Sequence, residues 1–320
     1  MTVRVGVIGT GFGAQVVAPA YATVDGCEVV DVVSPRDDGS VARLCARPDL
    51  DLVSVHSPPF LHLTHVTRAV AAGHAVLCDK PFGLDAAESA QMVQLAQDAG
   101  VIGLVNFERR FDPTRERLRA LLVEDAIGAP DHFQYSRYLA VPQPRPYNWL
   151  SDRARGGGWL GAQVSHLIDA TRWLFGEVVD ASGVMRTLVT ERPDRDGVMH
   201  TCDAEDAVAV VMKTDSGVTV AVDTAFESVV NLPERTAVHG AAGMLEIAGS
   251  AVVRTTLDGV ADTYGVDLGG RPNLVVSMER WAAVVCDAVR TGTAAPGSPT
   301  FADGLACAVV MDRIRGGAVS

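Results

Sequence analysis

The sequence predicts an α/β protein with a doubly wound parallel sheet at the N-terminus, followed by an α+β domain with a large, mostly antiparallel open sheet. Three observations support this prediction. The 320 residues exceed the usual size of one domain, and a 48% hydrophobic content suffices for two cores. The first third alternates short apolar runs with helix-like segments, as parallel sheets do. Alternating strand patterns then dominate, so we place the domains at 1–120 and 121–320.

The first domain is predicted from apolar runs that end in turn residues. We expect its strands at 3–8, 28–33, 52–56, 75–78 and 101–106. Helices are expected at 15–23, with Pro19 as an irregularity, and at 61–72 and 85–99, with Gly100 at the stop position. The stretch 34–49 is short for a crossover helix, so a trimmed element is expected there.

The second domain mixes helices and strands. A helix at 115–123 precedes a strand at 131–139, a proline-rich loop at 141–146 and a helix at 159–175. Strands at 207–213 and 218–224 flank Asp215-Ser216-Gly217, a hairpin signal, and strands at 235–239 and 243–247 continue the sheet. Helices are predicted at 274–291 and 301–314, and the last one is expected to pack back on the first domain.

Composition excludes several classes of function. The net charge of −12 argues against non-specific nucleic-acid binding, which needs a basic surface. The six cysteines form no C-x-x-C pair and no zinc-like spacing with histidine, so we expect a reduced, cytoplasmic protein. The chain runs straight into a strand, and no apolar run approaches the ~18 residues of a membrane span, so we expect neither a signal peptide nor a membrane partner.

A glycine turn follows the first predicted strand. Gly9 permits a tight turn, Gly11 lets backbone amides approach a pyrophosphate, and Ala14 takes the third position of G-x-G-x-x-G. The helix that follows offers N–H groups and a positive dipole end. Because the motif lies between a chain-initial strand and a helix, it predicts a dinucleotide site.

The residues at the end of the second predicted strand indicate whether NAD or NADP is bound. An acidic residue there would hold the ribose 2′-hydroxyl of NAD. This chain has Ser34 and Arg36, a hydroxyl and a planar cation that suit a 2′-phosphate. We therefore favour NADP, and NAD stays open because Asp31 and Asp37 are nearby.

Lysine is rare in this chain. Of 27 basic residues only Lys80 and Lys213 are lysines, so we expect a lysine at a strand end to have a functional role. Lys80 follows the fourth predicted strand, and ligands of open α/β sheets bind at the carboxyl ends of strands. We predict that it projects toward the nicotinamide and hydrogen-bonds a substrate oxygen.

A glycine run at Gly156 to Gly158 precedes the helix at 159–175. Helical spacing puts Ala162, Gln163, His166 and Asp169 on one shared face. A different, apolar stripe carries Leu160, Leu167, Ala170 and Leu174. A neutral imidazole is the natural proton carrier for carbonyl/alcohol interconversion. From the residues alone, a structural role for His166 remains open.

No metal site is expected. His56, His62 and His65 crowd the end of the third strand and the next helix, but no nearby residue completes a ligand set. We instead expect His62 to contact the cofactor. No G-x-S-x-G elbow or G-x-x-x-x-G-K-[ST] loop occurs, so hydrolase and nucleotide-triphosphatase functions lack support.

In order and spacing, the motifs resemble the Gfo/Idh/MocA family, the relatives of glucose–fructose oxidoreductase and inositol dehydrogenase, over nearly the whole chain. The matching segments are Val5 to Gly13, which includes Phe12; Ser57 and Pro58 through His62; Asp79-Lys80-Pro81, similar to the family's E-K-P; Asn106 through Pro113; Gly156 to His166; and Pro299 to Gly304.

The resemblance implies a Rossmann domain and an open-sheet domain that forms a homodimer or homotetramer. It implies hydride transfer between NAD(P) and a sugar, cyclitol or related polyol, with Lys80 in the active site and His166 transferring the proton. Cofactor contacts would come from the glycine turn, Ser57, Pro58, His62, Asp79 and Asn106. In addition to what the resemblance implies, we expect Arg109, Tyr147 and Trp149 to line the substrate pocket.

Two departures from the family pattern concern the substrate. Asp79 is one methylene shorter than the family's glutamate, although it could still contact the cofactor or orient Lys80. Ala162 stands where many members carry an aspartate, and Val164 replaces a frequent glycine. Gln163 or Asp169 would have to compensate, so the identity of the substrate cannot be carried over.

Two alternatives remain from other functional classes. One is a non-catalytic dinucleotide-binding regulator, which would oxidise no polyol. The other is an NAD-dependent glycosidase, which would release free sugar without net change of the cofactor. Lys80 and His166 argue against the first.

Overall fold

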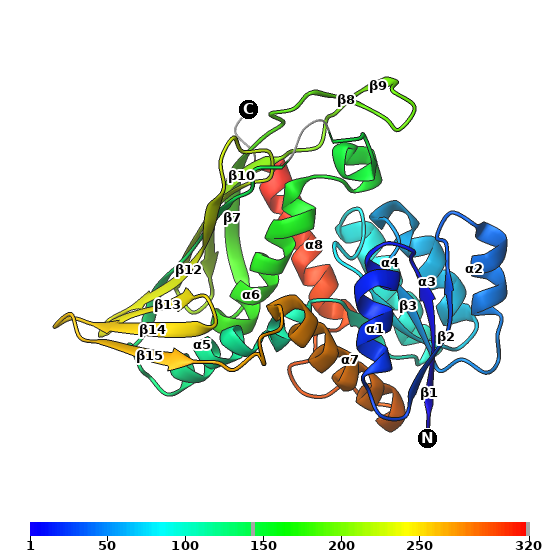
Figure 1. Cartoon of the computed structure of the whole chain (residues 1–320), viewed down its shortest axis with the longest axis horizontal. Coiled ribbons are helices and arrows are strands. Elements are labelled where there is room, and N and C mark those ends of the chain that lie inside the picture. Colours follow the sequence, from blue (N-terminus) through cyan, green and yellow to red (C-terminus); the bar gives the residue numbers. More distant parts are fainter. Residues whose placement is uncertain (142–144, 318–320) are drawn as a thin grey trace. The chain divides into compact units, whose positions relative to one another are not determined.

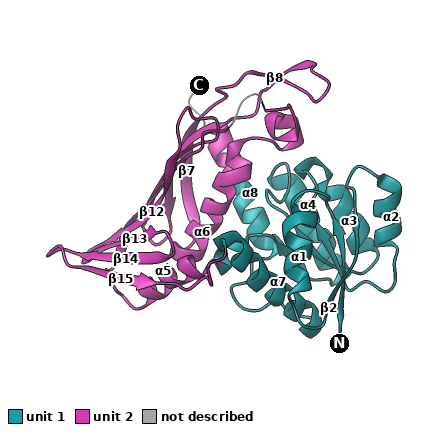
Figure 2. Ribbon diagram, in the orientation of Figure 1, with its two compact units in different colours: residues 1–111, 272–309 teal, residues 112–271, 310–320 magenta. Residues whose placement is uncertain are grey.

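The structure is a computed structural model that describes residues 1–141 and 145–317, so part of the predicted proline-rich loop lies outside the described residues. Two compact units make up the chain (Figure 2). Unit 1 comprises Met1–Phe111 and Pro272–Val309, and unit 2 comprises Asp112–Arg271 and Val310–Ser320. The division after Phe111 differs from the boundary expected near residue 120, and a C-terminal segment returns to unit 1.

Unit 1 contains a five-stranded parallel sheet (Figure 1). Its strands are β1 (Val3–Ile8), β2 (Cys27–Val33), β3 (Leu52–Val55), β4 (Ala75–Cys78) and β5 (Gly103–Val105), in the order β2-β1-β3-β4-β5. All five predicted strands are present, and β5 is shorter than expected. Because the chain leaves β1 for β2 and then returns to β3, strand order reverses there, which is where such sheets bind ligands.

Strand β1 is buried on both faces, which explains its unbroken apolar run. Val3, Val5 and Val7 belong to the core cluster formed with α1 (Ala18–Ala22) and α7 (Asn273–Thr291). On the opposite face, a Cβ at Gly6 would lie 3.0 Å from the Leu44 side chain of α2 (Asp38–Cys45). Helices therefore cover both faces of the sheet, as the predicted doubly wound fold requires.

The helices of unit 1 begin and end on expected residues. Asp85 caps α4 (Ala86–Ala99) by accepting a hydrogen bond from the Glu88 amide at 2.7 Å, and Gly100 ends it with φ 64°. Helix α2 is the trimmed element, and α3 (His62–Ala71) precedes β4. A wide π-type turn at Gly13–Val17 leads into α1, because Pro19 has no N–H for an ordinary helical turn.

Unit 2 is built on an eight-stranded sheet of order β15-β14-β13-β12-β6-β11-β10-β7. The predicted strands are β6 (Pro130–Tyr138), β10 (Ala207–Thr214), β11 (Thr219–Ala225), β12 (Leu232–Gly240) and β13 (Gly243–Ala248). Sequence patterns missed β7 (Val178–Arg186), β14 (Ala251–Thr256), β15 (Ala261–Gly265) and the small hairpin of β8 (Glu191–Pro193) and β9 (Met199–Thr201). Only the β6–β11 pair of the large sheet is parallel in the described residues.

Helices cover one face of this sheet. Helix α5 (Pro113–Val123) packs against β13 and β14, and α6 (Ser165–Phe175) packs against β7 and β10. Along β10, Val208, Val210 and Met212 are buried, whereas the intervening Ala209 and Val211 are exposed. This period of two indicates that no helix covers the opposite face in the described part of unit 2.

The last helix, α8 (Phe301–Gly316), begins against unit 1 strands. Phe301 packs on Phe82 with ring centroids 4.5 Å apart, and Thr300 pairs with Leu104 of β5. Gly304 lies so close to Phe82 and Val105 that a Cβ there would approach them within 2.7–2.8 Å. The start of α8 thereby closes the core beside the carboxyl end of β5.

Candidate functional site

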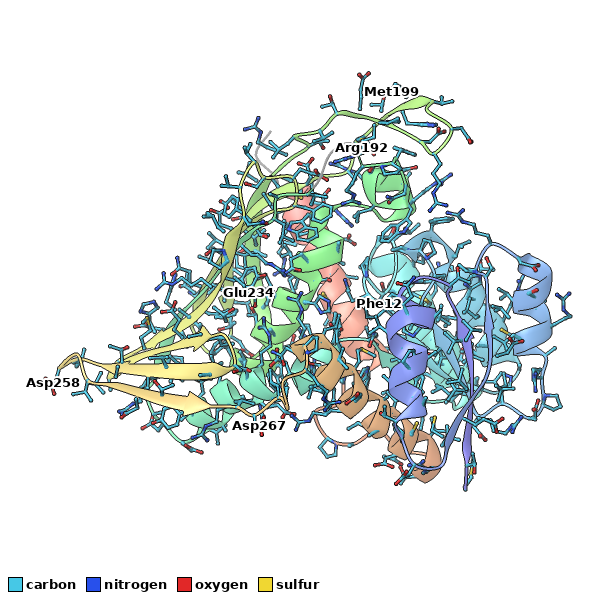
Figure 3. The ribbon with its side chains drawn as sticks, viewed as in Figure 1. Phe12, Arg192, Met199, Glu234, Asp258 and Asp267 are labelled. Atoms are coloured by element: carbon cyan, nitrogen blue, oxygen red, sulfur yellow. The ribbon has the colours of Figure 1, made fainter. Side chains whose placement is uncertain are left out.

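In the glycine turn after β1, two of the glycines leave no room for a side chain and one faces open space. Gly9 has φ 149°, and a Cβ there would lie 2.7 Å from the His56 carbonyl oxygen. A Cβ at Gly13 would lie 3.1 Å from the His56 Cβ, whereas one at Gly11 would meet nothing within 4 Å. Phe12 beside it, labelled in Figure 3, stays partly exposed. Its ring centroid lies 6.1 Å from that of His56. The open backbone at Gly11, at the start of a helix, fits a pyrophosphate.

The end of β2 presents Ser34 and Arg36. The Arg36 amide donates to the Ser34 hydroxyl at 3.3 Å, and the Arg36 side chain is exposed. Within residues 1–141 and 145–317, its guanidinium makes no hydrogen bond or ion pair. The adjacent carboxylates are engaged elsewhere, because Asp37 caps α2 through Ser40 and Asp38 pairs with Arg68 at 2.6 Å.

Two histidines hold the loop that follows β3. The buried His62 ring lies 2.8 Å from the Ser57 carbonyl oxygen and 3.1 Å from that of Phe82, while His65 Nδ1 lies 3.0 Å from the Ser57 hydroxyl. Burial lowers the pKa of His62, and burial also lowers the pKa of His65 to about 4. The contacts of the two histidines fix Ser57 and the partly buried Pro58 beside the ends of β3 and β4.

Asp79 is held from three sides. His56 Nδ1 lies 3.3 Å from its Oδ2, while the Asn106 side-chain amide and the Lys80 backbone amide donate to its Oδ1 at 3.3 and 2.9 Å. Burial acts to raise the pKa of Asp79, but the hydrogen bond with His56 and nearby positive charge outweigh it and hold this pKa below its usual value. The shorter carboxylate thus stays ionised and fixes the backbone that carries Lys80.

Lys80 is partly buried just beyond β4. Burial lowers its pKa, while the carboxylates of Asp79 and Glu108 oppose that effect. Glu108 is a member of this cluster that no sequence motif indicated, whereas the adjacent Arg109 is among the predicted site residues. The available signal was a charged residue three positions beyond a buried strand.

His166 lies on a helix that the sheet of unit 2 buries. A wide π-type turn at Leu160–Val164 runs directly into α6, and such turns are frequent at functional sites. His166 is 4% exposed and Asp169 is 2% exposed. Leu167 and Ala170, on the predicted apolar face, are buried as well. Both predicted faces of the helix are therefore buried, although Ala162 stays partly exposed.

Gln163 joins a polar network under the sheet. Its amide donates to the Tyr135 hydroxyl at 2.6 Å, which in turn donates to Glu234 Oε2 at 3.3 Å. Arg115 pairs with the same Glu234 at 2.8 Å. This network anchors one side of the helix to β6 and β12.

The entry to the helix is crowded by backbone and by Glu205. A Cβ at Gly157 would approach the Leu150 carbonyl oxygen within 2.6 Å, and one at Gly158 would collide with the Glu205 carboxylate. That carboxylate accepts from the Leu160 amide at 3.1 Å, and burial raises its pKa. Glu205 therefore caps the helix that carries His166, and only glycine fits beside it.

Replacing Gly158 by alanine is expected to lower the free energy of unfolding by about 3–5 kcal/mol. Its φ of 108° strains any side chain, and the new Cβ would displace a buried carboxylate from its cap. Urea unfolding measures the loss. The control is Gly217→Ala, which has φ 95° and open space around it, so it should cost only about 1–2 kcal/mol. Equal losses would contradict the role of Glu205.

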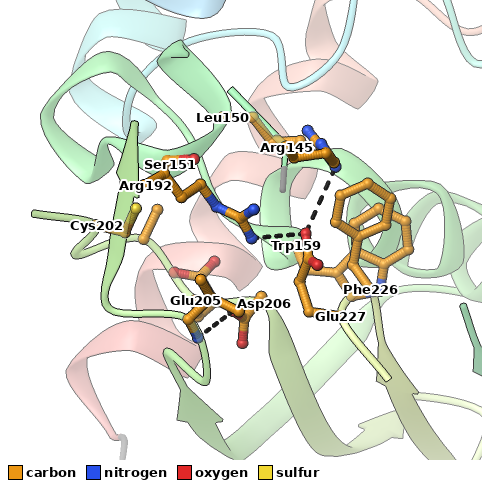
Figure 4. Close-up of a pocket in the computed structure, with 12 residues that line it drawn as sticks. Arg145, Leu150, Ser151, Trp159, Arg192, Cys202, Glu205, Asp206, Phe226 and Glu227 are labelled. Carbon is orange, nitrogen blue, oxygen red and sulfur yellow. Dashed lines mark hydrogen bonds and ion pairs between the residues drawn. The ribbon is translucent and has the colours of Figure 1, made fainter. Parts of the chain in front are cut away.

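A small polar cavity lies beside this entry (Figure 4). The buried side chain of Glu227 forms ion pairs with Arg192 at 2.7 Å and with Arg145 at 3.7 Å. The guanidinium group of Arg145 also lies over the Phe226 ring, and that ring stacks on Trp159. The cavity measures about 20 Å³, enough for about one water and too little for a sugar. The ion pairs support the helix entry, and sequence patterns did not single them out.

Tyr147 and Trp149 lie in the segment just before this entry. The Tyr147 ring stacks on His200 at 4.6 Å, and its hydroxyl donates to Asp152 at 3.2 Å. Trp149 begins a short 3-10 turn, Trp149–Ser151, which packs under Gly157.

Comparison with protein families decides the relationship. Residues 3–107 match the oxidoreductase family with an NAD-binding Rossmann fold, and residues 116–246 match the GFO/IDH/MocA C-terminal domain. The chain belongs to the Gfo/Idh/MocA family. The predicted family and fold class are therefore confirmed, and the N-terminal domain is an NAD-binding oxidoreductase domain.

Several family members are similar in sequence. An oxidoreductase of Synechocystis sp. is 31% identical over 59% of this chain, a match that spans only 56% of that relative's length. Levoglucosan dehydrogenase of Pseudarthrobacter phenanthrenivorans is 26% identical over 83% of this chain and 77% of its own. Inositol 2-dehydrogenase of Rhizobium meliloti is 25% identical over 76% of this chain and 74% of its own.

Solved structures share the fold. Levoglucosan dehydrogenase in complex with NADH and levoglucosan superimposes with a TM-score of 0.87 at 22% identity, covering 99% of this chain and 97% of that one. An oxidoreductase domain protein from Kribbella flavida superimposes with a TM-score of 0.88 at 19% identity with the same coverage.

Among the described residues, no helix combines the length and apolar character that a membrane crossing needs.

Proposed function

We propose that this protein transfers hydride between a nicotinamide dinucleotide and a sugar, cyclitol or related polyol or its carbonyl form. The observation that carries the proposal is Lys80, fixed at the carboxyl end of β4 by Asp79, in a domain whose glycine turn fits a pyrophosphate. Relatives named as levoglucosan, inositol and D-apiose dehydrogenases support a polyhydroxylated substrate.

In the proposed reaction, Lys80 holds the oxygen of the reacting carbon and stabilises negative charge as it develops there. His166 accepts the hydroxyl proton during oxidation and returns it during reduction. When bound, the dinucleotide provides the acceptor or donor of hydride. The residues that would bind its pyrophosphate are Gly9, Gly11, Phe12 and Gly13. The nicotinamide part of the cofactor site would be shaped by Ser57, Pro58, His62, Asp79 and Asn106. His62 would contribute by holding the loop that contains Ser57.

The remaining pocket residues define the substrate less closely. We assign Arg109, Tyr147, Trp149, Gln163 and Asp169 to substrate binding. Because Ala162 offers no carboxylate, and Gln163 already donates to Tyr135, the pocket should differ from that of members with an aspartate at this position.

A panel of sugars, cyclitols and small aldehydes, followed at the absorbance of the reduced cofactor, tests the function. Turnover of at least one polyol is expected. Free sugar released from a glycoside without net change of the cofactor would instead favour the glycosidase alternative, and cofactor binding without any turnover would favour a regulator.

We further propose that NADP is preferred over NAD. The exposed Arg36 guanidinium and the Ser34 hydroxyl suit a 2′-phosphate, while Asp37 and Asp38 are engaged elsewhere. The solved structure of levoglucosan dehydrogenase is a complex with NADH, so a preference for NADP would have to come from this chain's own residues at the end of β2.

Replacing Arg36 by alanine is expected to weaken NADPH binding about 10- to 100-fold and to leave NADH binding nearly unchanged. The loss is that of one charge-assisted contact with the 2′-phosphate. Fluorescence titration of the reduced cofactors measures both affinities. The control is Arg47→Ala, because Arg47 pairs with Asp49 beyond α2. Equal or tighter binding of NADH by the unaltered protein would refute the assignment.

We also propose a homodimer or homotetramer formed through the uncovered face of the large sheet. Val184 and Val211 on that face are 47% and 54% exposed. Apolar residues gathered on an open sheet favour association, and the mass of the protein in solution tests it. A cytoplasmic location remains a proposal, supported by six cysteines that form no disulfide bond among the described residues.

A further inference from the structure

Glu108 is a buried carboxyl group beside Lys80. Strands β4 and β5 pair in parallel with Cys78 opposite Val105, so the residues that follow both strands emerge at one edge. The Asn106 amide donates to the Cys78 carbonyl oxygen at 2.8 Å, and Glu108 then begins a 3-10 turn, Glu108–Phe111. Glu108 is only 5% exposed there.

The turn is held from its far end. Arg110 pairs with Asp303 of α8 at 3.0 Å and donates to the Gly297 carbonyl oxygen at 3.0 Å. Phe111 stacks on Trp281 of α7 at 4.6 Å. These contacts to two helices fix the backbone of the turn from which the buried Glu108 side chain projects.

Charged and titratable groups from several elements lie near Glu108 and Lys80. Asp79 comes from the end of β4, with His56 behind it, Arg109 from the turn itself, and Cys307 from α8. Burial raises the pKa of Glu108 to about 7, although Arg109 and Lys80 act to lower it. Burial lowers the pKa of Lys80, which Asp79 and Glu108 act to raise.

We propose that Glu108 is a positioning residue that sets the charge on Lys80, and its effect on turnover rests on the function proposed above. Asp79 is already engaged by His56, Asn106 and the Lys80 amide. Glu108 is therefore the second carboxylate that favours the ammonium form of Lys80. An ammonium group stabilises a developing alkoxide, whereas a neutral amine does so far less, so losing Glu108 weakens catalysis most at high pH.

The rarity of lysine permits a direct test without substrate. Trace labelling with acetic anhydride at a series of pH values reports the pH at which each amine loses its proton, and only Lys80, the exposed Lys213 and the N-terminus react as amines. Glu108→Gln is expected to move the labelling midpoint of Lys80 downward by about one pH unit or more, since it removes a nearby negative charge. Lys213 is the internal reference and should not move.

Glu108→Asp keeps the charge and should hold the Lys80 midpoint close to its original value. Asp98→Asn, an exposed carboxylate on α4, controls for loss of charge elsewhere in unit 1. An unchanged Lys80 midpoint in Glu108→Gln would overturn the proposal, whether or not the protein turns over a polyol.

The pH profile of kcat supplies the second readout. Glu108→Gln is expected to shift the basic limb to lower pH by the same amount as the labelling midpoint, whereas a purely structural defect would lower kcat equally at all pH values. A uniform loss of kcat would overturn the proposed effect on turnover. A shifted midpoint in a protein that turns over nothing would leave the link to Lys80 intact and refute the proposed function instead.

Discussion

Replacing Lys80 by methionine is expected to lower kcat about 100- to 1000-fold. Methionine keeps the length and much of the apolar stem but removes the only ammonium group assigned to the substrate oxygen, and loss of one such donor has effects of this size. The pyrophosphate contacts at Gly9 and Gly11 are unaffected, so affinity for the reduced cofactor should change less than about threefold. Steady-state kinetics and fluorescence titration measure the two quantities separately.

The chain supplies an ideal control for this variant. Lys213→Met makes the same substitution at the other lysine, which is exposed on β10. It should retain full turnover. Normal kcat in Lys80→Met would show that Lys80 does not act on the substrate, and a large loss of cofactor affinity would show that it acts through the dinucleotide.

Replacing His166 by alanine is expected to lower kcat about 100- to 10,000-fold, the range for loss of a general acid–base group. His166 is 4% exposed, so the substitution leaves an imidazole-sized space in a packed helix. Added imidazole should therefore restore part of the activity, and a structural role alone would not respond in this way. Cofactor titration should remain close to that of the unaltered protein.

His239→Ala is the matched control, because His239 is a partly buried histidine on β12 of the same unit. It should leave kcat within about twofold. If His166→Ala and His239→Ala lose activity equally, or if imidazole restores nothing while the fold is intact, then proton transfer by His166 is refuted.

Much of unit 1 was predictable because its signals are local. Gly9 and Gly100 mark turns within a few residues of a strand or helix end, and the apolar run at β1 reflects burial on both faces. In unit 2 the strands with a clear period of two, such as β10, were predicted, whereas β7 was missed. Its exposed valines and Gly183 blur the alternation, because the described residues of the unit leave one face of that strand uncovered.

The candidate site divides in the same way. The glycine turn, Lys80 at a strand end and His166 on a helix follow from motifs, lysine rarity and family resemblance. The residues that position these groups or shift their pKa do not follow from any sequence motif. His56 reaches Asp79 across 23 positions, and Glu205 caps Leu160 across 45.

The sequence by itself determined the order of the strands in unit 1 and the glycine turn, and it singled out Lys80 and His166 as the side chains that we propose to react. These properties depend on backbone conformations and periodicities that span a few residues. Only the tertiary structure decided that Glu108 lies buried beside Lys80, that His56 secures the short Asp79, and that Glu205 leaves room only for glycine at position 158. Those facts come from strand pairing and burial, which bring together residues that carry no common local pattern and change their charge by removing them from water.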